Sequence, residues 1–174
     1  MAGKKALIVI DMQNDFLWKS RKAMFSYDTQ KLTAAVNEKI HAFEQAGDDV
    51  IYIAHILPNL PTNRWFIGFS IRGTQGAQLY KGVDIVSQLY FEKNLSNSFT
   101  AKAFKAHMLA QDYAEIHICG LDLCGCVGKT ALGAVKECGK ASLYMDAVGC
   151  RFDAAKREKM IGRLKSAGVS LVGA

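Results

Sequence analysis

Short apolar runs alternate with helix-like segments along the whole chain, and this alternation limits the possible folds more than any other feature. The clearest runs are almost continuously apolar, as in strands that are buried on both faces of a sheet. The runs predict strands at Ala6–Ile10, Asp49–Ala54, Ala114–Gly120, Ala141–Met145 and Val169–Gly173, with a weaker candidate at Val86–Lys93.

The segments between these runs have apolar residues at helical spacing. Thr100 is a predicted N-cap, and several of the helices are expected to end at glycine. The predicted helices span Thr29–Gly47, Thr100–Asp112, Gly128–Gly139 and Asp153–Gly168. The alternation predicts an α/β fold, with a parallel sheet covered by helices on both faces. A chain of 174 residues suits a single domain, residues 1–174.

Residues 55–82 fit neither pattern, and they contain both prolines of the chain. Irregular segments of this length inside a compact domain usually form functional loops or lids. We therefore expect this segment to shape a binding site.

Charge and composition exclude several classes of protein. The net charge of +6 raises the question of nucleic-acid binding. The cations are scattered among acids without interleaved aromatics, however, so we expect no nucleic acid as a partner. The N-terminal apolar run, Ala6–Ile10, ends at Asp11 and is too short for a signal core or a membrane span. These features predict a cytoplasmic protein without membrane association. The five cysteines then favour free thiols over a disulfide scaffold.

Reactive side chains follow four of the predicted strands. Ligands bind beyond the carboxyl ends of the strands in an open parallel sheet. Asp11, His55 and Lys93 each come at such an end, and a cysteine cluster follows a fourth strand. Taken singly, Asp11 could be a turn residue and Lys93 a surface lysine. Together, each supplies the opposite charge that the other would need.

Three thiols, those of Cys119, Cys124 and Cys126, lie within eight residues of one another. Cys119 alternates with strand isoleucines, which indicates a core position. A thiol in the first turn of the following helix has a lowered pKa and is a candidate nucleophile. A Cys124–Cys126 redox pair is an alternative, whereas zinc is disfavoured because no second ligand pair follows. Cys138 and Cys150 suggest no function.

Three motifs resemble the isochorismatase-like cysteine hydrolases, which include nicotinamidases, N-carbamoylsarcosine amidases and ureidoacrylate amidases. They are "ALIVIDMQNDF" (Ala6–Phe16), "EKNLSNSF" (Glu92–Phe99) and "GLDLCGCVGKTALGA" (Gly120–Ala134). The resemblance implies a three-layer αβα, Rossmann-like fold, with a mostly parallel six-stranded sheet in the order 3-2-1-4-5-6. It also implies a homodimer or homotetramer, with Trp65 or Phe66 as candidate interface residues.

The resemblance assigns roles to individual residues. Asp11 matches the general base, Lys93 the lysine that orders base and nucleophile, and Cys126 the nucleophile, because Cys126, Val127 and Thr130 fit the pattern Cys-Val-x-x-Thr. A cis peptide bond is expected between Leu121 and Asp122. The backbone N–H groups of Asp122 and Cys126 would then bind the oxyanion.

Substrate contacts and metal binding are harder to assign. Phe16, Gln13, Trp65 and His55 are candidate substrate-binding residues, although core packing or turn stabilisation would also explain them. Nicotinamidases of this family bind a metal through Asp-x-His and a later histidine, whereas Ile53 stands two residues before His55 here. We expect no metal, and no dinucleotide because the glycine-rich phosphate loop is missing.

These inferences predict a metal-independent cysteine hydrolase that cleaves a small amide or a carbamoyl or ureido compound through a thioester. Its expected partner is a small-molecule substrate, and no cofactor is expected. Two alternatives remain: a thiol redox sensor or binding protein on the same scaffold, and an isochorismatase-type hydrolase of vinyl ethers.

Overall fold

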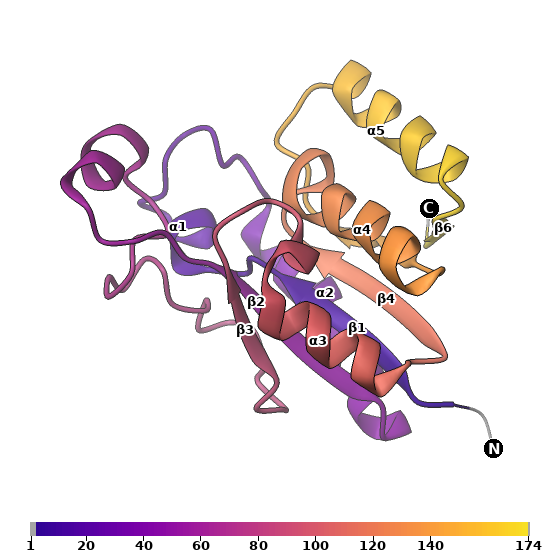
Figure 1. Ribbon diagram of the computed structural model, residues 1–174. Helices are drawn as coiled ribbons and strands as arrows, with labels where there is room; N and C mark the ends of the chain where they lie inside the picture. Colours follow the sequence, from indigo (N-terminus) through magenta and orange to yellow (C-terminus); the bar gives the residue numbers. More distant parts are fainter. Residues whose placement is uncertain (1–2, 174) are drawn as a thin grey trace.

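The computed structural model describes residues 3–173, and its central element is a six-stranded sheet in which every pair of neighbouring strands is parallel (Figure 1). The strand order is β3-β2-β1-β4-β5-β6, which confirms the predicted topology. The strands are β1 (Lys5–Ile10), β2 (Asp49–His55), β3 (Tyr90–Lys93), β4 (Glu115–Gly120), β5 (Ser142–Val148) and β6 (Ser170–Val172).

Five α-helices lie between the strands of the described residues; four of them agree closely with the predicted helices, whereas the short α1 was not predicted. They are α1 (Asn14–Leu17), α2 (Thr29–Ala46), α3 (Lys102–Gln111), α4 (Gly128–Cys138) and α5 (Ala154–Ser166). Gly47 and Gly139 end α2 and α4 in the left-handed conformation, as predicted. The predicted N-cap was wrong: Thr100 closes a 3₁₀ turn, Ser98–Thr100, whose cap is Asn97.

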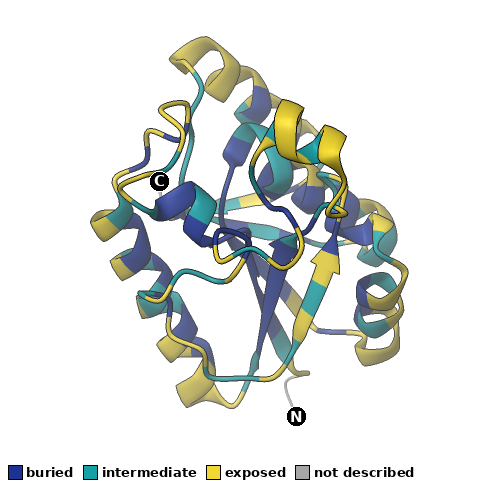
Figure 2. Cartoon of the chain, turned by 90° about the vertical axis from the view of Figure 1, so that its left-hand side faces the viewer, coloured by how far each residue is buried: buried dark blue, intermediate teal, exposed yellow. Residues whose placement is uncertain are grey.

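Two apolar layers hold the helices against the sheet. Alternate residues of β1 face opposite layers, because successive side chains of a strand point to opposite faces. Ile8 packs in the layer with α3, α4 and α5, whereas Leu7 packs in the layer with α2. Figure 2 shows the result, with buried strands in the centre and exposed residues on the outer faces of the helices. The structure is therefore the three-layer fold expected.

The edge strand β3 is shorter than the predicted strand at Val86–Lys93. The Val86 N–H donates to the Tyr52 hydroxyl at 3.1 Å, and the Ser87 hydroxyl donates to the Val50 carbonyl. Side-chain hydrogen bonds therefore take the place of regular backbone pairing at Val86 and Ser87, and the pairing of β3 with β2 starts at Tyr90.

The irregular segment 55–82 is fastened to the start of α1. Asp15 Oδ2 accepts the Ser70 N–H at 2.7 Å, and the Asn14 amide donates to the Gln75 carbonyl at 2.8 Å. Earlier in the segment, before these anchors, a π-helical turn, Asn63–Ile67, projects from the body of the molecule (Figure 1). Across residues 3–173, no helix has the length and apolar character needed to cross a membrane.

Candidate active site

Asp11 directly follows β1 and turns its carboxylate inward at the carboxyl end of the sheet. Its backbone has a positive φ of 53°, a left-handed conformation that is uncommon outside glycine. The Asp11 N–H donates to the Ile53 carbonyl at 2.8 Å and so extends the pairing of β1 with β2. The side chain is buried, and among the described residues its Oδ1 atom has no hydrogen-bond partner.

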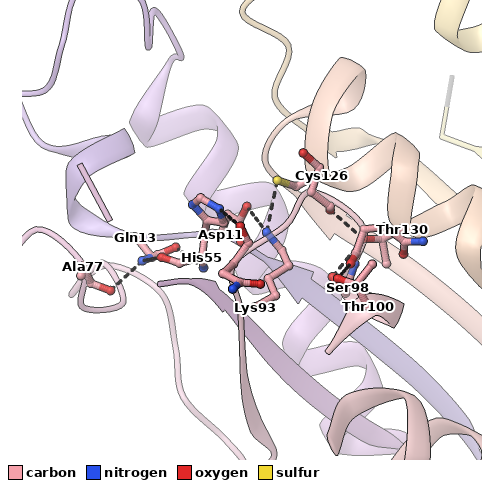
Figure 3. Close-up of polar contacts among 12 residues, drawn as sticks. Asp11, Gln13, His55, Ala77, Lys93, Ser98, Thr100, Cys126 and Thr130 are labelled. Atoms are coloured by element: carbon pink, nitrogen blue, oxygen red, sulfur yellow. Dashed lines mark hydrogen bonds and ion pairs between the residues drawn. The ribbon is translucent and has the colours of Figure 1, made fainter. Parts of the chain in front are cut away.

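Lys93 ends β3, two strands away from Asp11, and its buried ammonium group reaches back toward β1. Lys93 Nζ lies 2.9 Å from Asp11 Oδ2 and 3.2 Å from Cys126 Sγ (Figure 3). Burial opposes the charge of the lysine, but Asp11 and Cys126 more than offset this effect, so the pKa of Lys93 is raised. The sheet topology thus brings together three side chains that are separated by up to 115 residues (126 − 11).

Cys126 lies in a π-helical turn, Leu123–Val127, that joins β4 to α4 and is called the Cys126 turn below. The sequence predicted a lowered thiol pKa at this position, and that prediction was wrong. Burial and the Asp11 carboxylate raise the pKa of Cys126 to about 12, with Lys93 acting in the opposite direction. The resting sulfur is therefore a thiol, and an adjacent base is needed to ionise it.

Gly120 allows the Cys126 turn to lie close to β1. This glycine has a φ of +106°, and a Cβ atom there would collide with the carbonyl oxygen of Ile10. The same carbonyl accepts the Leu121 N–H at 2.9 Å. The Leu121–Asp122 peptide bond, which the family resemblance predicted to be cis, is cis in the structure.

Asp122 fixes the Cys126 turn to two other segments. Its Oδ2 atom accepts the Tyr27 hydroxyl and the Arg151 backbone N–H, both at 2.8 Å, while Oδ1 accepts the Cys124 N–H at 2.9 Å. Burial and the Asp122 carboxylate strongly raise the pKa of Tyr27, so its hydroxyl stays a proton donor. The carboxylate of Asp122 is therefore occupied in holding the backbone.

A cavity of about 190 Å³ opens over the Asp11 carboxylate and the Cys126 sulfur. Its walls are aromatic: Phe16 contacts Phe25 edge to face at 4.8 Å, and Phe69 contacts both rings. The further lining residues are Tyr27, His55, Ser96, Leu121, Asp122, Gly125 and Arg151. The volume admits only a small substrate.

Arg151 is the cavity residue that sequence reasoning missed most clearly. Its guanidinium stacks over the rings of Phe25 at 5.4 Å and Phe152 at 4.6 Å. Among residues 3–173, no carboxylate oxygen lies within 4 Å of this group. Arg151 follows the carboxyl end of β5. The rule that ligands bind beyond the carboxyl ends of parallel strands would therefore have identified it. Phe25 and Phe69 lie in loops and gave no comparable signal.

Two of the predicted substrate contacts do not lie at the cavity. Gln13 is fully buried; its amide donates to the His55 carbonyl at 3.0 Å and to the Ala77 carbonyl at 2.7 Å, and it accepts the His55 N–H at 2.8 Å (Figure 3). Its role is therefore to hold the end of β2. Trp65 is 82% exposed in the projecting turn, away from the cavity. Phe16 and His55 do line the cavity.

The other thiols separate into two groups. Cys119 is fully buried in the sheet, as predicted, and burial strongly raises its pKa. Cys124 does not pair with Cys126: its sulfur lies 3.8 Å from that of Cys150. All five cysteines, Cys124 and Cys126 included, are free thiols in the structure.

Comparison with known proteins identifies the family of this chain. The isochorismatase domain family matches residues 5–174. The chain belongs to the isochorismatase family. It is accordingly an isochorismatase-family hydrolase.

Individual relatives of this isochorismatase-family chain are distant. It is 26% identical over 157 residues to a Bacillus subtilis protein described as an uncharacterised isochorismatase family protein, PncA, covering 83% of this chain and 86% of the relative. The pyrazinamidase of Pyrococcus horikoshii, solved in complex with zinc, superposes with a TM-score of 0.79 at 24% identity, covering 98% and 99% of the two chains. The N-carbamoylsarcosine amidase of Thermoplasma acidophilum gives 0.78 at 23% identity, covering 97% and 95%.

The zinc in one of these family structures makes the surroundings of His55 important. Here His55 Nε2 pairs with the Asn94 carbonyl at 3.2 Å, and burial and the charge of Lys93 lower the pKa of this histidine. Ile53, two residues earlier, has no ligand atom. Within residues 3–173, His55 belongs to no group of three clustered His, Cys, Asp or Glu ligand atoms. These residues do not fit a zinc site.

Proposed function

We propose that this isochorismatase-family hydrolase is a metal-independent cysteine amidase that cleaves a small amide, carbamoyl or ureido compound bearing a carboxylate. The observation that carries the proposal is the position of Lys93 Nζ, which contacts both Asp11 Oδ2 and Cys126 Sγ, and Asp11 and Cys126 both line the cavity.

The first half of the proposed reaction forms a thioester. Asp11 accepts the Cys126 proton, and the thiolate attacks the carbonyl carbon of the substrate. Lys93 stabilises the negative charge as it moves from carboxylate to sulfur. The backbone N–H groups of Asp122 and Cys126 are the proposed oxyanion donors. Asp11 then protonates the leaving amine, and the C–N bond breaks.

The second half regenerates the thiol. Asp11, again a carboxylate, takes a proton from water, and the resulting hydroxide adds to the thioester carbonyl. The C–S bond breaks, and the sulfur recovers the proton from Asp11. Because a carboxylate performs each proton transfer, this proposed cycle requires no metal.

Arg151 and the aromatic walls support the choice of substrate. A guanidinium that lines the cavity and has no carboxylate partner among the described residues matches the geometry of a substrate carboxylate. The aromatic residues that flank it exclude water and leave little room, which favours a compact acid amide over a large one.

An ammonia-release screen tests this proposal. Small amides and carbamoyl or ureido compounds, each in a carboxylate form and a neutral form, are assayed with and without a chelator. We expect chelator-insensitive turnover that is lost in Cys126→Ala and retained in the matched variant Cys124→Ala. Chelator-sensitive turnover, or full activity in Cys126→Ala, would refute the proposal.

A further inference from the structure

Two thiols outside the proposed mechanism lie side by side. Cys124 belongs to the Cys126 turn and Cys150 to the loop between β5 and α5, and their sulfurs are 3.8 Å apart. Both residues are partly exposed. A disulfide bond is about 2.05 Å long, so the sulfurs need to approach by roughly 2 Å to form one.

Asp122 holds the two segments in this relation. One oxygen of its carboxylate accepts the N–H of Cys124, and the other accepts the N–H of Arg151, the residue after Cys150. The proximity of the sulfurs is therefore built into the backbone.

Cys124 also lines a second cavity of about 190 Å³, which we call the basic pocket. The basic pocket is lined by Cys124, Phe152, Lys156, Lys159, Met160 and Arg163. Among the described residues, none of its three cations has a carboxylate oxygen within 4 Å.

Nearby carboxylates oppose this positive charge. Asp122 and Asp153 both lie close enough to influence Cys124. Each of them already accepts a backbone N–H, Asp122 from Cys124 and Asp153 from Lys156. The three unpaired cations therefore make the basic pocket attractive to an anion.

We propose that the basic pocket binds an anionic low-molecular-weight disulfide and that Cys124 and Cys150 reduce it. The Cys124 thiol releases its proton to water, and its sulfur attacks one sulfur of the ligand. The ligand S–S bond breaks, and a protein–ligand mixed disulfide forms while the first ligand thiolate takes up a proton.

The second step completes the exchange. The Cys150 sulfur, after losing its proton, attacks the Cys124 sulfur of the mixed disulfide. The second ligand thiolate leaves and is protonated, and a Cys124–Cys150 disulfide remains. The protein has lost two protons and two electrons, that is, two hydrogens, and the ligand has become two thiols.

The protonation of Cys124 sets the pH dependence of this exchange. Burial and the neighbouring Cys150 sulfur raise the pKa of Cys124 to about 12. Exchange is therefore slow at neutral pH and accelerates as the pH rises. The resulting disulfide would tie the Cys126 turn to the loop that carries Arg151.

The test uses the Cys126→Ala variant, so that its outcome does not depend on the proposed amidase. The protein is incubated at low ionic strength with oxidised glutathione, which is anionic, or with neutral bis(2-hydroxyethyl) disulfide, and is followed by intact mass and peptide mapping. We expect loss of two hydrogens, a Cys124–Cys150 cross-link, and a roughly tenfold faster reaction with the anionic disulfide.

Further variants separate the two steps and the charge effect. In Cys150→Ser, the reaction should stop at glutathione attached to Cys124. Lys159→Glu should remove the preference for the anionic disulfide, whereas Lys165→Glu, on the same helix but outside the basic pocket, should keep it. Equal rates with both disulfides, or a cross-link involving another cysteine, would overturn the proposal.

Discussion

The Tyr27 hydroxyl donates to Asp122 Oδ2 at 2.8 Å and joins the segment before α2 to the Cys126 turn across 95 residues of sequence. Removing this hydroxyl in Tyr27→Phe leaves a buried carboxylate with one donor fewer. We expect a loss of about 1–3 kcal/mol in the free energy of unfolding, measured by chemical denaturation. Tyr80→Phe is the matched control, because the Tyr80 hydroxyl makes no hydrogen bond within residues 3–173.

The buried pair of Lys93 and Asp11 allows stability and activity to be separated. Lys93→Met leaves the Asp11 charge buried without a cation, so we expect a loss of about 3–5 kcal/mol in unfolding free energy. The double variant Asp11→Asn/Lys93→Met removes both charges and should regain most of this stability while remaining inactive. Denaturation curves and ammonia-release assays on the same preparations provide the comparison. If the double variant is no more stable than Lys93→Met, the unpaired charge is not the cause of the loss.

Alkaline pH should destabilise the protein through Tyr27. Its pKa in the folded protein is raised far above the usual value of 10.0, mainly by burial and by Asp122. Above about pH 10, the unfolded chain releases this proton while the folded protein keeps it, so stability is complete below that pH and falls as the pH rises. The raised pKa of Lys93 acts in the same direction.

The slope of unfolding free energy against pH, measured between pH 9 and 11, tests this assignment. The slope for Tyr27→Phe should be shallower than the slope for the native protein by up to one proton, which is about 1.4 kcal/mol per pH unit. An unchanged slope would place the alkaline sensitivity on other groups.

The fold was predictable because buried parallel strands leave an unambiguous pattern in the sequence. The apolar runs at β1, β2 and β4 marked the centre of the sheet, and Asp11 and Lys93 were found because each ends a strand. The thiol pKa was not predictable, since it depends on burial by residues that are distant in sequence.

Side chains with two plausible roles were the least predictable. Gln13 could have faced a ligand or the backbone, and only the path of residues 55–82 shows that the Ala77 carbonyl accepts its amide. Cys150 gave no signal at all, because its proximity to Cys124 arises from the β5–α5 loop.

Trp65 and Phe66 provide a test of self-association. Both side chains are 82% exposed on the projecting π-helical turn, which is unusual for large apolar residues in contact with water. We propose that this turn forms part of an interface in a homodimer or homotetramer. The double variant Trp65→Ala/Phe66→Ala should shift the mass measured by light scattering toward the monomer, while exposed Leu109→Ala on α3 should not. A native protein that is monomeric at high concentration would contradict this proposal.

Arg151 is expected to select substrates by charge. Losing a charge-assisted hydrogen bond to a substrate carboxylate costs about 1.5–3 kcal/mol, which corresponds to a roughly 10- to 150-fold loss in kcat/KM. Arg151→Gln should therefore lower kcat/KM for carboxylate-bearing amides by this factor and leave the neutral analogues almost unchanged, with the effect mainly in KM. Because the backbone N–H of residue 151, which Asp122 binds, is retained, the unfolding free energy should change little.

Arg151→Lys should recover part of the discrimination, since it restores the charge without the planar geometry. An equal loss on charged and neutral substrates would show that the guanidinium supports the aromatic wall of the cavity and does not bind a carboxylate.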